Sequence, residues 1–368
     1  MRLIGPIALH SFILQNSGMV RIIADIIKAK GIEGGALLAF LAPLTGQRNG
    51  AVPIIKEKSA SGLQNYENGS LDGLINLQRV NDIMGINAFF KAGNAKLKEG
   101  ASMIACMENL EQRRDRLFKK FPWGVNLLYY MLDFVYKRIF PKFRLTKRIY
   151  FALTQGRNRA LSKSEILGRL VYCGFEIEEV QEINKLMYFK AVKRRAPLEE
   201  PEPSSGILLR VKRIGHRGKS ITVYKFRTMH PYAQYIQDYV FAQNDLAEGG
   251  KFRDDFRITK WGRWMRRFWI DEIPMIWNIL RGDLKLVGVR PLSEHYLSLY
   301  SSEIKAIRVQ GKPGLIPPFY ADMPKNLDEI QASEHRYMQA YIESPYTTDL
   351  QYCLRAFQNI VLKKARSN

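Results

Sequence analysis

The sequence predicts a mixed α/β protein of two domains, and three observations lead to that prediction. Apolar runs of strand length alternate with segments of helical period in both halves of the chain. A stretch rich in Pro and Glu lies at 196–203, a composition typical of a linker. The length of 368 residues fits two domains of ordinary size. We therefore expect an α/β module at 1–195, a linker at 196–205 and a compact α/β domain at 206–368.

The N-terminal module shows its elements in order. Residues 82–97 have the pattern of a helix, and the short apolar run 101–107 predicts a strand. Ser162 and Glu165 have the spacing of a capping box, which predicts a helix toward Tyr172. Residues 175–180 and 186–193 then predict a strand pair that turns at Asn184 and Lys185.

This strand, capped helix and terminal hairpin resemble the C-terminal half of class I methyltransferase folds. Such enzymes need a glycine-rich loop that lets the backbone approach an adenosyl cofactor. Gly34 and Gly35 lack the residues and the acidic partner that would complete that loop. We expect a degenerate module with a structural, docking or regulatory task.

The second domain contains two adjacent carboxylates, Asp271 and Glu272, among clustered cations. Phosphoryl transfer needs such a set, because carboxylate oxygens suit Mg²⁺ and cations absorb charge on phosphate oxygens. A carboxylate can also attack phosphorus directly. Neighbouring residues on a helix point about 100° apart, which favours two different roles. The alternative is a helix start that pairs with surface arginines.

The candidate phosphate ligands have alternatives too. Lys225 and Arg227 lie in a segment, 224–229, that alternates polar and apolar residues, so they are also compatible with solvated charges on a half-buried strand. Arg290 precedes Pro291, which disfavours helix and predicts extended or turn backbone.

A series of short strings runs through this domain in a fixed order. They are Arg213-Ile-Gly215, Gly218-Lys219, Tyr224-Lys-Phe-Arg-Thr-Met229, Asp255-Phe-Arg-Ile-Thr259, Gly262-Arg263, Arg266-Arg267, Asp271-Glu272, Trp277-Asn278, Arg281-Gly-Asp283, Leu286-Val-Gly288, Arg290-Pro291 and Lys312-Pro-Gly314. In these strings the region from about Ser205 to Lys363 resembles the bacterial sugar transferase family, the polyprenyl-phosphate phosphoglycosyl transferases.

The resemblance implies transfer of a sugar 1-phosphate from a nucleotide diphosphate sugar, such as a UDP-sugar, to polyprenyl (undecaprenyl) phosphate. Nucleoside monophosphate would leave, and the step would initiate a surface polysaccharide or glycoconjugate. Asp271 would be the nucleophile, through an aspartyl-phosphosugar intermediate, and Glu272 with Asp283 would serve Mg²⁺. The family's phosphate-binding positions fall on Lys225, Arg227, Arg266 and Arg290.

The sequence departs from the family at several places. Val289 and Phe256 replace prolines, and Leu-Ile-Pro-Pro-Phe-Tyr follows Gly314. These changes concern sugar and nucleotide preference more than the chemistry. The family's hydrophobic helix before the catalytic block is replaced by the charged, proline-rich stretch 193–205.

Contact with a membrane must therefore come from surface segments. The longest apolar run, 34–44, falls short of the roughly 20 residues that a spanning helix needs, and the N-terminal run with His10, Gln15 and Asn16 does not fit a secretory signal. We expect a peripheral or monotopic protein at the cytoplasmic face of the bacterial inner membrane. A net charge of +22 favours an anionic membrane surface as partner.

Two segments could make that contact. Trp261, Trp264 and Phe268 recur with Met265 at helical spacing among arginines, which is typical of an interfacial helix. The second is 123–151, where aromatic and basic residues intermix; its alternative is a core helix with a solvated basic face.

A different class of function also fits the charge. A non-catalytic basic protein could bind nucleic acid or anchor a complex at a membrane, although this would not explain the ordered motif strings; our prediction includes no nucleic acid. Cys106, Cys173 and Cys353 are widely spaced, which favours reduced thiols.

Overall fold

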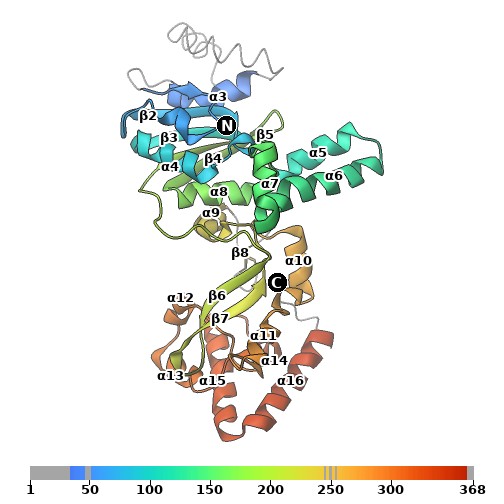
Figure 1. The fold of residues 1–368 in the computed structure, drawn as a ribbon. Helices are drawn as coiled ribbons and strands as arrows, with labels where there is room; N and C mark the ends of the chain where they lie inside the picture. Colours follow the sequence, from blue (N-terminus) through green and yellow to red (C-terminus); the bar gives the residue numbers. More distant parts are fainter. Residues whose placement is uncertain (1–33, 46–50, 244–245, 248–250, 253–254, 363–368) are drawn as a thin grey trace. The chain divides into compact units, whose positions relative to one another are not determined.

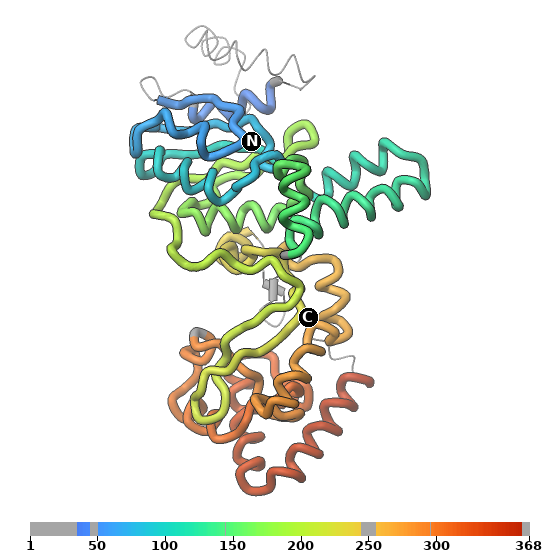
Figure 2. Tube along the Cα trace, in the orientation of Figure 1, coloured from blue at the N-terminus to red at the C-terminus, as the bar shows by residue number. Residues whose placement is uncertain are grey.

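The computed structural model describes residues 34–45, 51–243, 246–247, 251–252 and 255–362. The mixed α/β prediction is confirmed (Figure 1). The chain forms two compact units: the first runs to Pro203 and includes Pro231–Gln237, and the second comprises Ser204–His230 and the chain from Asp238 onward. Figure 2 traces each unit along the sequence. The apolar N-terminal run discussed above lies outside the described residues.

The first unit is organised by a five-stranded sheet of order β1-β2-β3-β5-β4. Its first three strands are parallel to one another, whereas β5 is antiparallel to both β3 and β4. The strands are β1 (Ile54–Ile55), β2 (Leu71–Arg79), β3 (Leu97–Met107), β4 (Phe175–Ile183) and β5 (Leu186–Lys193).

Helices cover both faces of this sheet. On one face, α3 (Gly34–Thr45) places Leu37, Phe40 and Leu41 in a buried core with side chains of β2, β3 and β5. On the other face, α4 (Ile86–Lys96) places Phe90 against Phe189 of β5. The helix α8 (Lys163–Tyr172) packs beside α4 and β4. Short helical turns lie at η1 (Ala60–Leu63), η2 (Val80–Asp82) and η6 (Ala233–Ile236).

The predicted elements of the module are present. Helix α4 falls inside 82–97, and β3 contains 101–107 but begins earlier. Asn184 and Lys185 turn between β4 and β5 with φ of 50° and 63°, the left-handed backbone that a tight hairpin turn requires. The Ser162 hydroxyl accepts from the Glu165 N–H at 3.2 Å as expected, but the Glu165 carboxylate accepts from Arg138 and Arg169 instead of completing the capping box.

A helical extension leaves the sheet between β3 and α8. Helices α5 (Leu110–Lys120) and α6 (Val125–Phe134) form a hairpin that projects from the first unit in Figure 1. A π-helical turn, η3 (Val135–Ile139), and a 3₁₀ turn, η4 (Phe140–Lys142), lead into α7 (Arg144–Thr154).

The second unit begins with an antiparallel hairpin of β6 (Leu208–Ile214) and β7 (Ser220–Phe226). A second, parallel pair is formed by β10 (Lys285–Val287) and β11 (Gly314–Ile316). The helical elements that follow the first strand are η5 (His216–Gly218), α9 (Gln237–Gln243), whose first residue belongs to the first unit, α10 (Lys260–Arg267), η7 (Ile270–Glu272), α11 (Met275–Leu280), α12 (Glu294–Ser298), α13 (Ser302–Arg308), α14 (Phe319–Asp322), α15 (Leu327–Glu343) and α16 (Pro345–Leu362). The short pair β8 (Leu246–Ala247) and β9 (Lys251–Phe252) completes the unit.

Two glycines of the motif strings allow backbones to touch. A Cβ on Gly314 would lie 2.1 Å from the Gly288 nitrogen, and one on Gly262 would lie 2.0 Å from the Thr228 carbonyl oxygen. Any side chain would therefore push β11 from the chain after β10, or α10 from the chain after β7.

No helix within the described ranges is both long and apolar enough to cross a membrane. The apolar run 34–44 forms α3, which has Pro43 in its last turn and packs on the sheet. None of the three cysteines, all of which the structure describes, forms a disulfide, and Cys106 and Cys173 are buried.

Candidate active site

One face of the β6–β7 hairpin forms a wall of a cavity of about 390 Å³ in the second unit. Residues two apart in a strand share a face, and cross-strand partners lie on the same side. Arg213 pairs with Ile221 and Leu209 pairs with Lys225, so Arg213 and Lys225 both belong to the cavity face. Lys225 thus lies on the cavity face of the hairpin.

The two carboxylates lie in the short turn η7, after a residue with strained backbone. Trp269 has φ of 53°, a left-handed conformation that is unfavourable for a bulky side chain. Its indole N–H donates to the Tyr320 hydroxyl at 3.0 Å, and the two rings meet edge to face. This anchor stabilises the turn, so Asp271 and Glu272 enter the interior from 3₁₀ rather than α-helical backbone.

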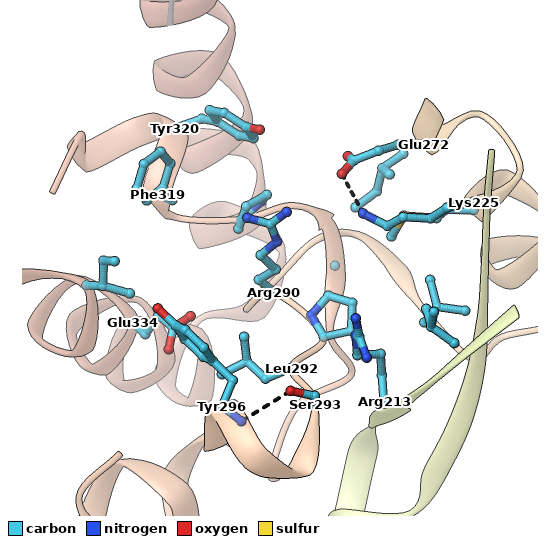
Figure 3. A pocket seen from close by; sticks show the side chains of 18 of the residues that line it. Arg213, Lys225, Glu272, Arg290, Leu292, Ser293, Tyr296, Phe319, Tyr320 and Glu334 are labelled. Carbon is cyan, nitrogen blue, oxygen red and sulfur yellow. Dashed lines mark hydrogen bonds and ion pairs between the residues drawn. The ribbon is translucent and has the colours of Figure 1, made fainter. Parts of the chain in front are cut away.

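Glu272 lines the cavity and is paired with Lys225. The Lys225 Nζ donates to Glu272 Oε1 at 2.7 Å (Figure 3). Burial lowers the pKa of Lys225, and the Glu272 charge opposes that shift. The two groups thus form a hydrogen-bonded ion pair at the edge of the cavity.

Asp271 is buried beside Glu272, with only 7% of its surface exposed. Its Oδ1 has no hydrogen-bond partner among the described residues. Burial raises the pKa of Asp271 and the Glu272 charge raises it further, whereas Lys225 and Arg266 lower it. An ionised carboxylate with an uncommitted oxygen is costly to bury, and such groups concentrate at functional sites.

The predicted cations separate into two places. Arg266, on α10, donates from Nε to the Thr228 hydroxyl at 3.0 Å and acts electrostatically on Asp271. Arg227, beyond the end of β7, donates to the Gly206 carbonyl oxygen and the Ser204 hydroxyl, both at 2.8 Å. The structure therefore places Arg227 on the 204–206 segment and not among the residues that line the cavity.

Arg290 lies in the cavity in non-helical backbone, as its position before Pro291 predicted. Figure 3 shows its guanidinium between the Lys225–Glu272 pair and the rings of Phe319 and Tyr320. Within the described ranges no carboxylate forms an ion pair with it. The backbone of Arg290 is fixed by Arg308, which donates to its carbonyl oxygen at 2.6 Å. Arg308 is itself paired with Glu334.

Much of the cavity wall was not singled out from the sequence. Arg213 appeared only within a motif string, and its strand parity with Lys225 was the signal that could have identified it. The opposite wall includes the following side chains: Ser293, Tyr296, Tyr300, Phe319, Tyr320 and Glu334. They come from segments after Arg290, and Phe319 and Tyr320 belong to the string after Gly314 that departs from the family.

Asp283, the second expected Mg²⁺ ligand, lies apart from the cavity lining. Its Oδ2 accepts from Asn278 Nδ2 at 3.2 Å, and Asn278 also donates to the Thr222 carbonyl oxygen. No cluster of three or more metal-ligating His, Cys, Asp or Glu side chains occurs in the part of the chain that the structure describes. The adjacent Asp271 and Glu272 still fit Mg²⁺, which takes one or two protein carboxylates and fills its other positions with phosphate and water.

Apolar side chains near the site are exposed. Trp261 and Trp264 on α10 and Phe268 after it form a ladder of ring contacts at the surface. Four apolar side chains between η7 and the end of α11 are also exposed, which the sequence did not predict: Ile273, Ile276, Trp277 and Leu280. Exposed aromatic and aliphatic groups beside arginines are typical of an interfacial membrane contact.

The fold and site define a domain equipped for chemistry on phosphate groups, and comparison with known proteins gives its family. Residues 196–363 match the bacterial sugar transferase family. The C-terminal part of this chain belongs to that family.

Individual relatives agree with this assignment. The chain is 41% identical over 111 residues to the uncharacterized sugar transferase EpsL of Bacillus subtilis, covering 30% of this chain and 48% of that protein. It is 39% identical over 120 residues to a UDP-glucose:undecaprenyl-phosphate glucose-1-phosphate transferase of Caulobacter vibrioides, covering 32% and 40%. The chain thus spans about half or less of the length of these relatives.

Among solved structures, a SAM-dependent methyltransferase from Thermotoga maritima shares 13% identity with this chain at a TM-score of 0.23. The match covers 35% of this chain and 59% of the methyltransferase. The likeness is distant and concerns the fold alone.

Proposed function

We propose that this chain transfers a sugar 1-phosphate from a nucleotide diphosphate sugar, such as a UDP-sugar, to polyprenyl phosphate at a membrane surface. The observation that carries the proposal is the buried Asp271, with one oxygen unpartnered, beside a cavity that Glu272, Lys225 and Arg290 line. The family assignment and the likeness to the UDP-glucose:undecaprenyl-phosphate glucose-1-phosphate transferase of Caulobacter support the same reaction. The product would begin a surface glycan.

In the proposed first step, an Asp271 oxygen attacks the sugar-linked β-phosphorus. The bond from that phosphorus to the bridging oxygen breaks, and nucleoside monophosphate leaves with the electron pair. An oxygen of polyprenyl phosphate then attacks the same phosphorus, which releases the Asp271 carboxylate and forms the lipid-linked diphosphate sugar. Two simpler displacements thus replace one.

The neighbouring groups have separate tasks in this scheme. Arg290 and Lys225 bind phosphate oxygens, for which guanidinium and ammonium groups are suited. Arg266 and Lys225 favour the ionised form of Asp271. Glu272 would hold Mg²⁺, which supplies positive charge to the phosphate oxygens when it is bound.

The exposed residues of α10 and α11 would bring this site to the lipid acceptor. Trp261, Trp264 and Phe268 are directed outward, whereas Arg266 of the same helix bonds Thr228 within the unit. One side of α10 thus contacts the unit that contains the site. The opposite side would contact a bilayer interface, where tryptophan is favoured.

The deciding assay measures nucleoside monophosphate release from a panel of nucleotide sugars, with Mg²⁺ and with or without undecaprenyl phosphate in liposomes. We expect lipid-dependent release that disappears in Asp271→Asn. Mass spectrometry without the lipid acceptor should find a phosphosugar on a peptide containing Asp271.

The matched control is Asp328→Asn, an exposed aspartate in the same unit that should keep full activity. Substantial lipid-dependent release by a folded Asp271→Asn protein would contradict the covalent scheme. No release across the panel, from wild-type protein that binds liposomes, would favour a non-catalytic docking protein.

A further inference from the structure

The first unit contains a helical segment that exposes apolar side chains and turns polar ones toward the protein. In α6 the apolar side chains Leu127, Leu128, Met131 and Leu132 are exposed, and Val135 continues the same stripe. Their spacing places them on one side of the helix. The sequence left open whether 123–151 forms a core helix with a solvated basic face; the exposures exclude that arrangement for α6.

The inward side of α6 carries polar groups beside the rings of Tyr130 and Phe134. Asn126 is buried, and Asp133 accepts from the buried Arg113 of α5 at 2.6 Å and 2.7 Å. Farther along, Arg138 is buried and donates to the Ala160 carbonyl oxygen at 3.0 Å. In this helix the polar side chains contact the rest of the protein and the leucines are exposed. Such an arrangement favours an apolar environment on the exposed side of the helix.

Exposed apolar side chains continue in α7 and at the tip of the hairpin. Leu145, Ile149 and Leu153 repeat every four residues and are exposed, with Leu145 at 87%. Trp123, in the turn between α5 and α6, is 96% exposed. We call these side chains, with the α6 stripe, the α6–α7 surface.

Charge identifies what this surface fits. Residues 118–157 contain many Lys and Arg but one acidic residue, Asp133, whose carboxylate is already neutralised by Arg113. Lys119, Lys120, Lys147 and Arg148 are exposed around the apolar groups. Leucines and a tryptophan rimmed by cations match an anionic bilayer, whose headgroups attract the cations while its acyl region accepts the apolar side chains.

We propose that the α6–α7 surface is a docking site of the first unit for an anionic phospholipid bilayer. This gives the module, which lacks a glycine-rich cofactor loop, a task of its own. The inference goes beyond the proposed transferase activity, because it assigns a second lipid contact to the unit that does not contain Asp271.

The test compares amide hydrogen exchange of the full chain with and without vesicles. With vesicles of equal parts phosphatidylglycerol and phosphatidylcholine, peptides from 123–157 should exchange several-fold more slowly than without lipid. Vesicles of phosphatidylcholine alone should protect them much less, since the attraction to Lys and Arg is electrostatic. Following these peptides separates this contact from any contact through α10.

Two variants and a matched control define the surface. Leu145→Ser with Ile149→Ser should abolish the protection, and Lys147→Glu with Arg148→Glu should weaken vesicle binding of the segment about 10-fold or more. Lys56→Glu with Lys58→Glu alters two exposed lysines elsewhere in the unit by the same charge and should change the protection little. Circular dichroism and thermal unfolding establish that each variant is folded.

Three results would overturn the proposal. One is the absence of protection with anionic vesicles, and another is an equal loss in the Lys56 and Lys58 control. The third is protection that grows with protein concentration without vesicles, which would identify a second copy of the chain as the occupant. The Asp271→Asn protein should dock like the wild type, so failure of docking and failure of the transferase chemistry can be told apart.

Discussion

Glu165 of the first unit and Asp271 of the second are both buried carboxylates with cations nearby, and they differ in a way that separates structure from chemistry. Glu165 of the first unit is 2% exposed and forms ion pairs with Arg138, Lys142 and Arg169. Burial works to raise its pKa, but these cations hold the pKa well below the usual range. Asp271 has the opposite balance, since burial and Glu272 raise its pKa and one oxygen stays unpartnered.

The difference teaches that burial of an acid among cations is not in itself a sign of catalysis. Both oxygens of Glu165 are occupied, so this group can only hold α8 to the segments that carry Arg138 and Lys142. Asp271 keeps one buried oxygen without a hydrogen bond and is adjacent in the chain to Glu272, which lines a cavity of ligand size. The number of carboxylate oxygens that already have hydrogen-bond partners, more than the charge nearby, distinguishes the structural Glu165 from the proposed nucleophile Asp271.

Removing the nucleophile should have the largest effect. In Asp271→Asn we expect lipid-dependent nucleotide release to fall by roughly 10³-fold or more, because the variant cannot form the covalent intermediate. Initial-rate measurements at varied donor and acceptor check this, and the wild type should give parallel double-reciprocal lines. Intersecting lines would instead indicate direct displacement.

Breaking the structural cluster should affect stability rather than turnover. Glu165→Gln leaves three cations without their carboxylate and should lower the free energy of unfolding of the first unit by about 3–5 kcal/mol. Hydrogen exchange of the α8 amides under denaturant measures this loss. The exposed pair of Glu178 with Lys190 provides the control, since Glu178→Gln should cost less than about 1 kcal/mol.

Removing a cation beside Asp271 should move the pH profile of activity. Lys225 lowers the pKa of Asp271, so Lys225→Met should shift the acid limb of kcat/KM toward higher pH. The control is Arg210→Met, because Arg210 pairs with Tyr224 on the other face of the hairpin. An unshifted limb would mean that a different group controls it.

The smallest expected effect is a difference in how stability depends on pH. Because the folded-state pKa of Asp271 is raised, its charge costs stability at neutral pH, and this cost is lost as pH falls from the folded pKa toward the lower unfolded pKa. Asp271→Asn should therefore stabilise the chain slightly at neutral pH and less in acid. Glu165 has a lowered pKa, so its contribution is present above its unfolded pKa and is lost as pH falls toward the folded value. Thermal unfolding of both variants across pH measures these opposite trends.

Local elements were largely predictable from sequence. The turn at Asn184 and Lys185, the Ser162 cap and the alternation around Lys225 depend on a few neighbouring residues. Such features are set by backbone preference and side-chain period, which short segments specify. The predicted capping box is incomplete, because the Glu165 carboxylate bonds Arg138, 27 residues earlier, instead of the backbone of Ser162.

The candidate site was predictable in part. The sequence indicated Lys225, Glu272 and Arg290 as neighbours, and the structure gathers them around one cavity. It did not indicate that Arg227 bonds to the 204–206 segment, or that aromatic side chains from the segments after Arg290 form the opposite wall.

By itself the sequence determined the mixed α/β class and the family of the C-terminal part. Only the tertiary structure decided which carboxylate is satisfied, which arginine faces the cavity and which helices expose their apolar sides. The physical reason is that these properties depend on partners far apart in the chain, as with Trp269 and Tyr320, separated by 51 residues. Local propensity cannot specify such contacts, because they form only when the whole core packs.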